Sequence, residues 1–208
     1  VCRSDGGVKG SGPAPAANDA RNATRLTATP AADPSVSGTA AMTTFAVASD
    51  TLLVDEDGNT PDVAATYKAA MGSRPYGYWD LAADPGLPQS YLTAHKNVVW
   101  WTGNTYPAPV TPYEAELKAL LDGGGRLMMS GQDILDQAAG TTTFVRDYLH
   151  IRWAGPDTQK DKPPTTVPGL AAHPVLRGWP ANPFDPASLD GDSRDAITPT
   201  PPCTPPRP

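Results

Sequence analysis

The stretch from residue 97 to residue 133 constrains the fold more than any other part of the chain. Two apolar runs, at residues 98–102 and 126–130, flank a segment with the apolar spacing of an amphipathic helix. A strand, a helix and a second strand in this order form a βαβ unit, which almost always joins parallel strands by a right-handed crossover. The sequence therefore predicts a parallel sheet in which these two runs are neighbouring strands.

The helical segment carries start and stop signals at its two ends. Thr111 is predicted as its N-cap, Pro112 as its first residue, and Glu114 as the partner that completes a capping box. Three glycines at residues 123–125 end the helix, because glycine readily adopts a positive φ.

The neighbouring segments extend this pattern into an α/β domain. The run of apolar residues without alternation at 98–101 predicts a strand that is buried on both faces. Pro61 and Asp62 suit the start of a helix that ends at Gly72. Other segments predict a first strand at 51–55, a second strand at 76–80, helices at 133–137 and 141–150, and an edge strand at 151–154. We expect a three-layer αβα fold with a short, mainly parallel sheet.

Prolines and glycines divide the chain into three parts. The chain has 25 prolines and 19 glycines in 208 residues, and residues 1–44 and 156–208 are together rich in Pro, Gly, Ala, Ser, Thr and Asp. Residues 1–44 are predicted to be a linker or an extended N-terminal segment, and residues 156–208 a proline-rich, irregular C-terminal tail. Residues 45–155 form the predicted α/β domain.

The charge balance argues against two classes of partner. The chain has 22 acidic and 16 basic side chains, for a net charge of −6. Nucleic acids and anionic membranes both require a basic surface, so neither is expected as a partner. No apolar run approaches the roughly 20 residues of a membrane-spanning helix. The composition of the two terminal segments, which could become ordered on a partner, favours instead a protein partner or a neighbouring domain or subunit.

The two cysteines, Cys2 and Cys203, lie near opposite ends of the chain. Neither belongs to a CxxC motif or a Cys/His cluster, which argues against a zinc site. In an oxidising compartment they would pair with each other; unpaired thiols, or bridges to segments outside the chain, are the alternatives. The low lysine content and the abundance of Thr, Pro, Gly and Ala favour a secreted protein.

Acidic residues follow the first predicted strand, and they suggest a cation site. Asp55, Glu56, Asp57 and Asn59 surround a glycine turn, and calcium prefers several oxygen ligands on a bent backbone. Asp55 and Asp57 are the predicted metal ligands. The full EF-hand pattern is absent. The alternative is a solvated acidic turn in which Asp62 caps the first helix. No cofactor other than calcium is indicated.

Further polar residues follow the other predicted strands. Asn104 comes after the central strand, and Gln132 and Asp133 come after the last one. The carboxyl ends of parallel strands share one edge of the sheet, where ligands usually bind. These three residues are therefore candidate ligand-binding residues.

Ser130 is the only candidate nucleophile at this edge. A nucleophile there would lie in a sharp turn from strand to helix, but a GxSxG motif would need glycine where Met128 and Gln132 stand. The alternative is a tight turn at Ser130 and Gly131, with Ser130 or Asp133 capping the next helix.

Six aromatic residues could form a platform for carbohydrate, or pack inside the domain. All but the last lie in or beside predicted strands, which favours core packing. They are Tyr76, Tyr78, Trp79, Trp100, Trp101 and Tyr106.

Four short motifs occur in the order VDEDG, YWD, VVWWTG and LDGGGRLMMSGQDI, at residues 54–58, 78–80, 98–103 and 121–134. Together they resemble the glutamine-amidotransferase-like accessory domain of secreted bacterial peptidases, of the immune inhibitor A and subtilisin-like types. The resemblance implies a flavodoxin-like fold, an extracellular location and a non-catalytic role beside a catalytic domain. This chain lacks the closing strand pair with a GFxFE-like motif that is usual in that family.

These observations predict a secreted, non-catalytic accessory or interaction domain. It would be related to, or excised from, a secreted peptidase, or would form part of an extracellular assembly. Two other classes remain open: a hydrolase that uses Ser130 at the carboxyl edge, and a calcium-binding or carbohydrate-binding module.

Overall fold

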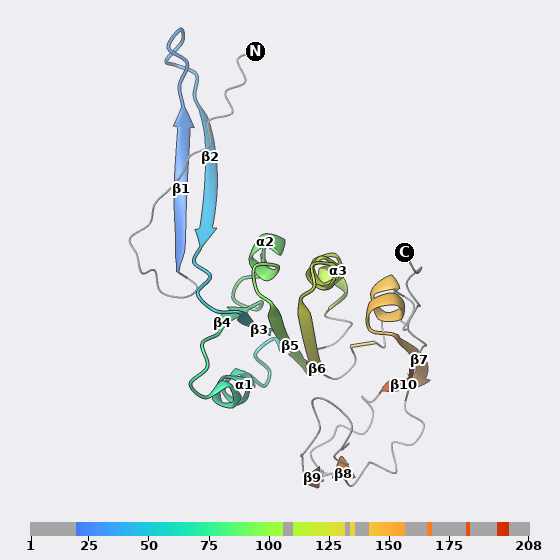
Figure 1. Ribbon diagram of the computed structural model, residues 1–208. Coiled ribbons are helices and arrows are strands. Elements are labelled where there is room, and N and C mark those ends of the chain that lie inside the picture. The colour runs from blue at the N-terminus through green and yellow to red at the C-terminus, as the bar shows by residue number, and fades with distance from the viewer. Residues whose placement is uncertain are drawn as a thin grey trace.

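Four parallel strands form the central sheet, in the order β4-β3-β5-β6. They are β3 (Thr51–Asp55), β4 (Gly77–Asp80), β5 (Asn97–Gly103) and β6 (Arg126–Gly131). Strands β5 and β6 pair in parallel, with Val98 opposite Leu127 and Trp101 opposite Ser130. The parallel neighbours that the βαβ pattern predicts are therefore confirmed (Figure 1).

The computed structural model describes residues 20–105, 110–131, 134–135, 142–156, 166–167, 182–183 and 195–199. The predictions for Cys2, Cys203, Tyr106, Gln132 and Asp133 lie outside the described residues. No helix in the described part of the chain has the length and apolar character needed to cross a membrane.

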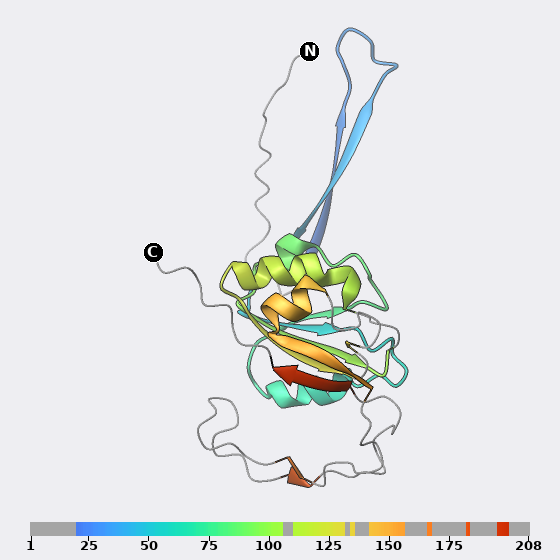
Figure 2. The ribbon, with the colours of Figure 1, turned by 90° about the vertical axis from the view of Figure 1, so that its right-hand side faces the viewer.

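Helices cover both faces of the sheet. Helix α1 (Ala64–Met71) lies on one face, and α2 (Gln89–Leu92) and α3 (Glu114–Asp122) lie on the other (Figure 2). The result is a mixed α/β domain whose parallel sheet is flanked by helices, consistent with a flavodoxin-like fold.

Adjacent tryptophans on β5 enter the two opposite cores. Trp100 packs in the larger core with Leu52, Leu117 and Leu120, on the side of α2 and α3. Trp101 points to the other face, where its ring stacks on Tyr67 of α1 with centroids 4.2 Å apart. Side chains alternate across a strand, so an unbroken apolar run must be buried on both faces, as the sequence predicts.

Helix α3 begins differently from the prediction. Residues Thr111–Tyr113 form a 3₁₀ turn, and the α-helix starts at Glu114 without a side-chain cap, so the capping box at Thr111 is wrong. Tyr113 accounts for the difference. Its hydroxyl donates to the Pro85 carbonyl at 3.2 Å and its ring packs against Trp100 with centroids 5.3 Å apart. These contacts hold the first turn in the tighter 3₁₀ form.

Helix α1 also starts later than Pro61, at Ala64. The N-cap residue is Val63, which makes no side-chain capping bond; Asp62 lies one residue before it and accepts the backbone N–H of Ala64 at 2.8 Å.

The N-terminal part contains a long hairpin where the sequence predicted a linker or extended segment. Strands β1 (Arg21–Ala28) and β2 (Gly38–Phe45) pair antiparallel over eight residue pairs. The hairpin projects from the sheet domain (Figures 1 and 2). Its connection is too long for a two-residue hairpin signal such as Asn-Gly, and the strands are rich in small and polar residues, so local patterns did not identify it.

The C-terminal elements also differ from the prediction. Strand β7 (Ile151–Pro156) does not join the central sheet as an edge strand; it pairs antiparallel with β10 (Asp195–Pro199). A further short pair joins β8 (Thr166–Val167) and β9 (Asn182–Pro183). The part predicted as an irregular tail therefore contributes strands of its own.

The two predicted helices before β7 are only partly seen. A single π-helical segment, η2 (Phe144–Tyr148), replaces the predicted helix at 141–150. Of the helix predicted at 133–137, the structure describes only residues 134–135, which lie in a turn.

The packing of Trp101 gives a test of this architecture. Replacing this fully buried side chain by alanine should lower the free energy of unfolding by about 3–5 kcal/mol, because the large cavity cannot collapse inside a sheet. The control is Met128→Ala on the neighbouring strand, where the side chain is 58% exposed and the change should stay within about 0.5 kcal/mol. Urea denaturation of both variants measures the difference, and equal effects would contradict the described register.

Candidate functional site

Three aspartates meet at the carboxyl edge of the sheet. Asp55 ends β3, Asp57 lies in the following turn, and Asp62 precedes α1. One carboxylate oxygen from each lies within 4.8 Å of the others. Asp55 and Asp57 are only 1% and 2% exposed, whereas Asp62 is exposed. The structure thus brings the two predicted calcium ligands together and adds Asp62 to them.

Asp55 is held by a tyrosine and by its own turn. Its carboxylate accepts the Tyr78 hydroxyl at 2.7 Å and the Asp57 backbone N–H at 3.2 Å. Burial raises the pKa of Asp55 above its ordinary value; the two hydrogen bonds lower it, and the nearby Asp57 charge raises it again. Burial, then the bond to Asp55, raises the pKa of Tyr78, so its hydroxyl keeps its proton and acts as the donor.

Asp57 organises the connection between β3 and α1. One carboxylate oxygen accepts the Asn59 N–H at 2.7 Å, and the other accepts the Val63 N–H at 2.8 Å. Gly103 of β5 packs directly against this aspartate: it has a φ of 53°, and a Cβ there would lie 2.7 Å from Asp57 Cβ. A glycine is therefore required where the end of β5 passes the acidic turn.

Glu56 points to the opposite face of the sheet and bonds a core tryptophan. Its carboxylate accepts the Trp100 indole N–H at 2.5 Å, and its backbone carbonyl accepts the Thr105 hydroxyl at 2.9 Å. Burial raises the pKa of Glu56 to about 7, against the lowering effect of the indole N–H. The sequence analysis included Glu56 in the acidic group that suggested a cation site. In the structure its carboxylate is bonded to Trp100, and the carboxylates that lie close together are those of Asp55, Asp57 and Asp62.

Asn104, the first of the three candidate ligand-binding residues, is exposed in the turn after β5. It directly follows Gly103, the residue that packs on Asp57. The other two candidates, Gln132 and Asp133, are outside the described residues. A joint site formed by all three is therefore still a prediction.

Ser130 lies within β6, and not in a turn. Strand β6 continues through Gly131, so the predicted tight turn at Ser130–Gly131 is wrong. The cause is close strand packing: a Cβ on Gly131 would lie 1.8 Å from Thr102 Oγ1. His95 lies before the start of β5, at the opposite end of the sheet from Ser130, and its Nδ1 is 2.9 Å from the Tyr91 carbonyl. This histidine is thus not placed to serve Ser130 as a base.

The tryptophans of the proposed carbohydrate platform pack inside the domain. Trp79, Trp100 and Trp101 are all buried. Trp79 donates its indole N–H to the Asp84 carbonyl at 2.7 Å, and Trp100 donates to Glu56. The core-packing alternative is therefore correct for these three residues, and they cannot present an exposed stacking surface.

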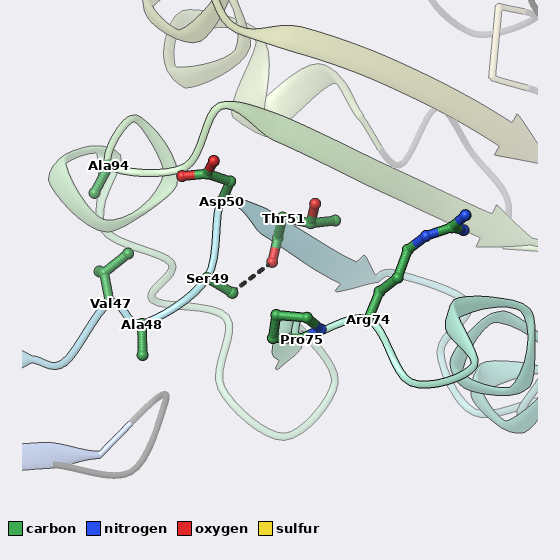
Figure 3. A pocket seen from close by; sticks show the side chains of 8 residues that line it. All are labelled: Val47, Ala48, Ser49, Asp50, Thr51, Arg74, Pro75 and Ala94. Atoms are coloured by element: carbon green, nitrogen blue, oxygen red, sulfur yellow. Dashed lines mark hydrogen bonds between the residues drawn. The ribbon is translucent and has the colours of Figure 1, made fainter. Parts of the chain in front are cut away.

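A pocket of about 680 Å³ opens at the other edge of the sheet, where the strands begin (Figure 3). Its wall comes from the segment before β3, the loop before β4 and the end of the turn after α2. The lining residues are Val47, Ala48, Ser49, Asp50, Thr51, Arg74, Pro75 and Ala94. Asp50 in this wall is paired with Lys96 at 2.9 Å. No sequence pattern marked this pocket, because the rule for parallel sheets directs attention to the carboxyl edge.

The raised pKa of Glu56 predicts a pH-dependent stability. In the folded protein this pKa rises from an ordinary value of 4.5 to about 7, so the folded state favours the neutral acid. The resulting contribution is present in full below about pH 4.5, and about 3 kcal/mol is lost as the pH rises through about 7. Glu56→Gln, which keeps an oxygen for the Trp100 N–H, should remove this part of the slope. Urea denaturation at a series of pH values measures it.

The matched control for this experiment is Glu114→Gln on α3. It removes one carboxylate without touching the bond to Trp100, and it should keep the pH profile of the parent protein. A Glu56→Gln profile as steep as that of the control would contradict the assignment.

No protein-family model matches the chain, and neither the curated proteins nor the solved structures contain a match. The resemblance to the accessory domains of secreted peptidases therefore stays a prediction from the four motifs quoted above.

Proposed function

We propose that the chain is a non-catalytic interaction module of an extracellular protein, and that the β1–β2 hairpin is its contact arm. The observation that carries this proposal is the exposure of the hairpin. Nearly every residue of both strands is exposed, although the strands pair without interruption over eight residue pairs. A two-stranded hairpin alone in water is marginally stable, and packing against another surface stabilises it.

The two faces of the hairpin differ in chemistry. Residues directly opposite each other in antiparallel strands share a face. One face, here named the uncharged face, contains Asn22, Thr24, Leu26, Ala28, Gly38, Ala40, Met42 and Thr44. On it Leu26 and Met42 are 48% and 45% exposed. The other face carries Arg21 and Arg25. Exposed apolar side chains on a projecting element favour a role in protein contact.

The base of the hairpin is anchored to the domain core. The Arg21 guanidinium lies 4.1 Å from the Trp79 ring centroid and pairs with Asp84 at 2.5 Å. Phe45, at the other strand end, packs against Tyr91 with ring centroids 4.9 Å apart. A contact arm needs such a base, because an anchored element loses less conformational entropy when it binds.

The extracellular setting and the relation to peptidases are proposed from the sequence. The motifs at residues 54–58 and 121–134 resemble accessory domains of secreted peptidases, whose role is non-catalytic. In this setting the arm would contact a neighbouring domain of the parent protein or another component of an extracellular assembly.

The contact role of the arm can be tested by site-specific photo-crosslinking. A photoreactive benzoylphenylalanine in place of Met42 should give a crosslinked product in culture medium of the producing cells, because its side chain would face the partner. The same residue in place of Ala115, which is exposed on α3, is the control and should give none. A Met42 variant without product, or with no more product than the control, would overturn the proposal.

A second candidate function, calcium-dependent stabilisation, is favoured by the three aspartates at the carboxyl edge. Asp55, Asp57 and Asp62 bring carboxylate oxygens within 4.8 Å of one another. No basic side chain forms a salt bridge to them in the described part of the chain. A hard cation would reduce the repulsion between these carboxylates and would find oxygen ligands on a bent backbone.

Calcium at this position should raise the melting temperature. At 100 times its Kd, a ligand that binds only the folded state adds about 2.7 kcal/mol of stability. Asp62→Asn should abolish the rise, since it removes the exposed charge but keeps an oxygen for the Ala64 N–H. Asp50→Asn, at the amino end of β3, is the matched control and should leave the rise intact. If calcium does not change the melting temperature of the parent protein, this function is excluded.

A further inference from the structure

Within the described residues, the outer edge of β2 has no strand paired with it and is exposed to solvent. Strand β2 pairs with β1 on one side only, and no other strand in the described part of the chain pairs with it. All its residues except Phe45 are exposed. Such an edge is a template for another strand, which adds by the same backbone hydrogen bonds that hold the hairpin together.

The β2 edge lacks the usual protection against strand addition. Natural edge strands commonly carry a charged side chain, a proline or a bulge. The sequence of β2 is GTAAMTTF, with no charge and no proline, and its register with β1 contains no bulge. Strand β1, by contrast, contains Arg21 and Arg25 on one face. Pairing of two β1 edges would bring like charges together, whereas pairing of two β2 edges brings none.

The geometry points to a symmetric dimer in which β2 pairs antiparallel with β2 of a second copy of this chain. This inference rests on the proposed role of the hairpin as a contact arm, and it names the partner. A two-fold axis perpendicular to the plane of the paired strands would give a four-stranded sheet in the order β1-β2-β2-β1. Registers such as Ala40 opposite Met42 of the second copy keep both uncharged faces on the same side. The four strands then share one apolar surface formed by two Leu26 and two Met42 side chains.

The neutral edge disfavours a partner that binds through charge, and β2 of a second copy supplies an equally neutral strand. The pairing edge is neutral, so it offers no complementary charge to an acidic or basic protein. Each whole chain carries a net charge of −6, so the two copies repel each other at low ionic strength. Salt screens this repulsion and leaves the backbone pairing unaffected, so association should strengthen as salt increases. A contact made by salt bridges would weaken instead.

The interface involves only one strand from each copy, so the surface area it buries is small compared with the roughly 1,600 Å² of a standard protein interface. The dimer should therefore be weak and should dissociate on dilution. Sedimentation velocity of the full chain should show a mass that rises with concentration from 21.7 kDa toward twice that value. A chain that remains monomeric at every concentration and salt level would overturn the inference.

Two matched variants locate the contact. Ala40→Lys puts a charge on the uncharged face at β2, where the two copies would bring their lysines together, and should raise the dimer Kd at least tenfold. Thr24→Lys adds the same charge to the same face but on β1, and should leave the Kd within a factor of about two. Equal weakening by both variants would place the contact elsewhere and contradict the inference.

Hydrogen exchange of the parent protein makes the test independent of how the variants fold. Backbone amides of Gly38–Phe45 should exchange more slowly in concentrated than in dilute protein, and the outer amides of Arg21–Ala28 should not change. Unchanged exchange in both strands would contradict strand pairing.

The outcome can be separated from that of the proposed function. If the Met42 crosslinker attaches to a different protein while the purified chain stays monomeric, the contact arm stands and the symmetric dimer fails. If the crosslinker attaches to nothing, both fail.

Discussion

The parallel pairing of β3 with β5 is the interaction on which the rest of the domain depends. It sets Val54 opposite Trp100 and Asp55 opposite Trp101. The two indoles then enter opposite cores, one against α3 and the other against α1. A slip of one residue would exchange these side chains between the faces, placing each large ring where the other helix packs. The same pairing fixes where β3 ends, and therefore where the acidic turn begins.

The acidic turn is held by the backbone it connects, which explains how carboxylates can be buried there. Both oxygens of Asp57 accept backbone N–H groups, and Asp55 accepts one more together with the Tyr78 hydroxyl. Four donors thus replace the water that burial removes. The cost appears in the raised pKa of Asp55, since hydrogen bonds compensate only part of the desolvation. Asp62 adds a third carboxylate, which is exposed. No basic side chain in the described part of the chain forms a salt bridge with any of the three, so this edge of the sheet is acidic.

Sequence patterns predicted the parts of the fold that depend on local chemistry. The doubly buried run at β5, its parallel partner β6 and the helix between them follow from side-chain periodicity, and so do the neighbouring positions of Asp55 and Asp57. The 3₁₀ start of α3 was missed because it depends on Tyr113 reaching Pro85, a contact between distant segments. The partner of β7 lies about 40 residues further along the chain, in a part where prolines predicted an irregular tail. Ser130 looked like a turn residue, but the close approach of Gly131 to Thr102 keeps it in the strand.

The hairpin combines a fixed base with an open edge, and the two properties support each other. Strand addition to a mobile segment must first compensate for the entropy lost in ordering it, at roughly 1–2 kcal/mol per residue. Here the Arg21 contact with Trp79 and the packing of Phe45 on Tyr91 order the base of both strands before any partner arrives. From this base the two strands pair without interruption toward the tip, so backbone pairing orders the rest of the hairpin. An edge of neutral, exposed residues on an element ordered in this way can gain stability from backbone pairing, in addition to the contacts of Leu26 and Met42.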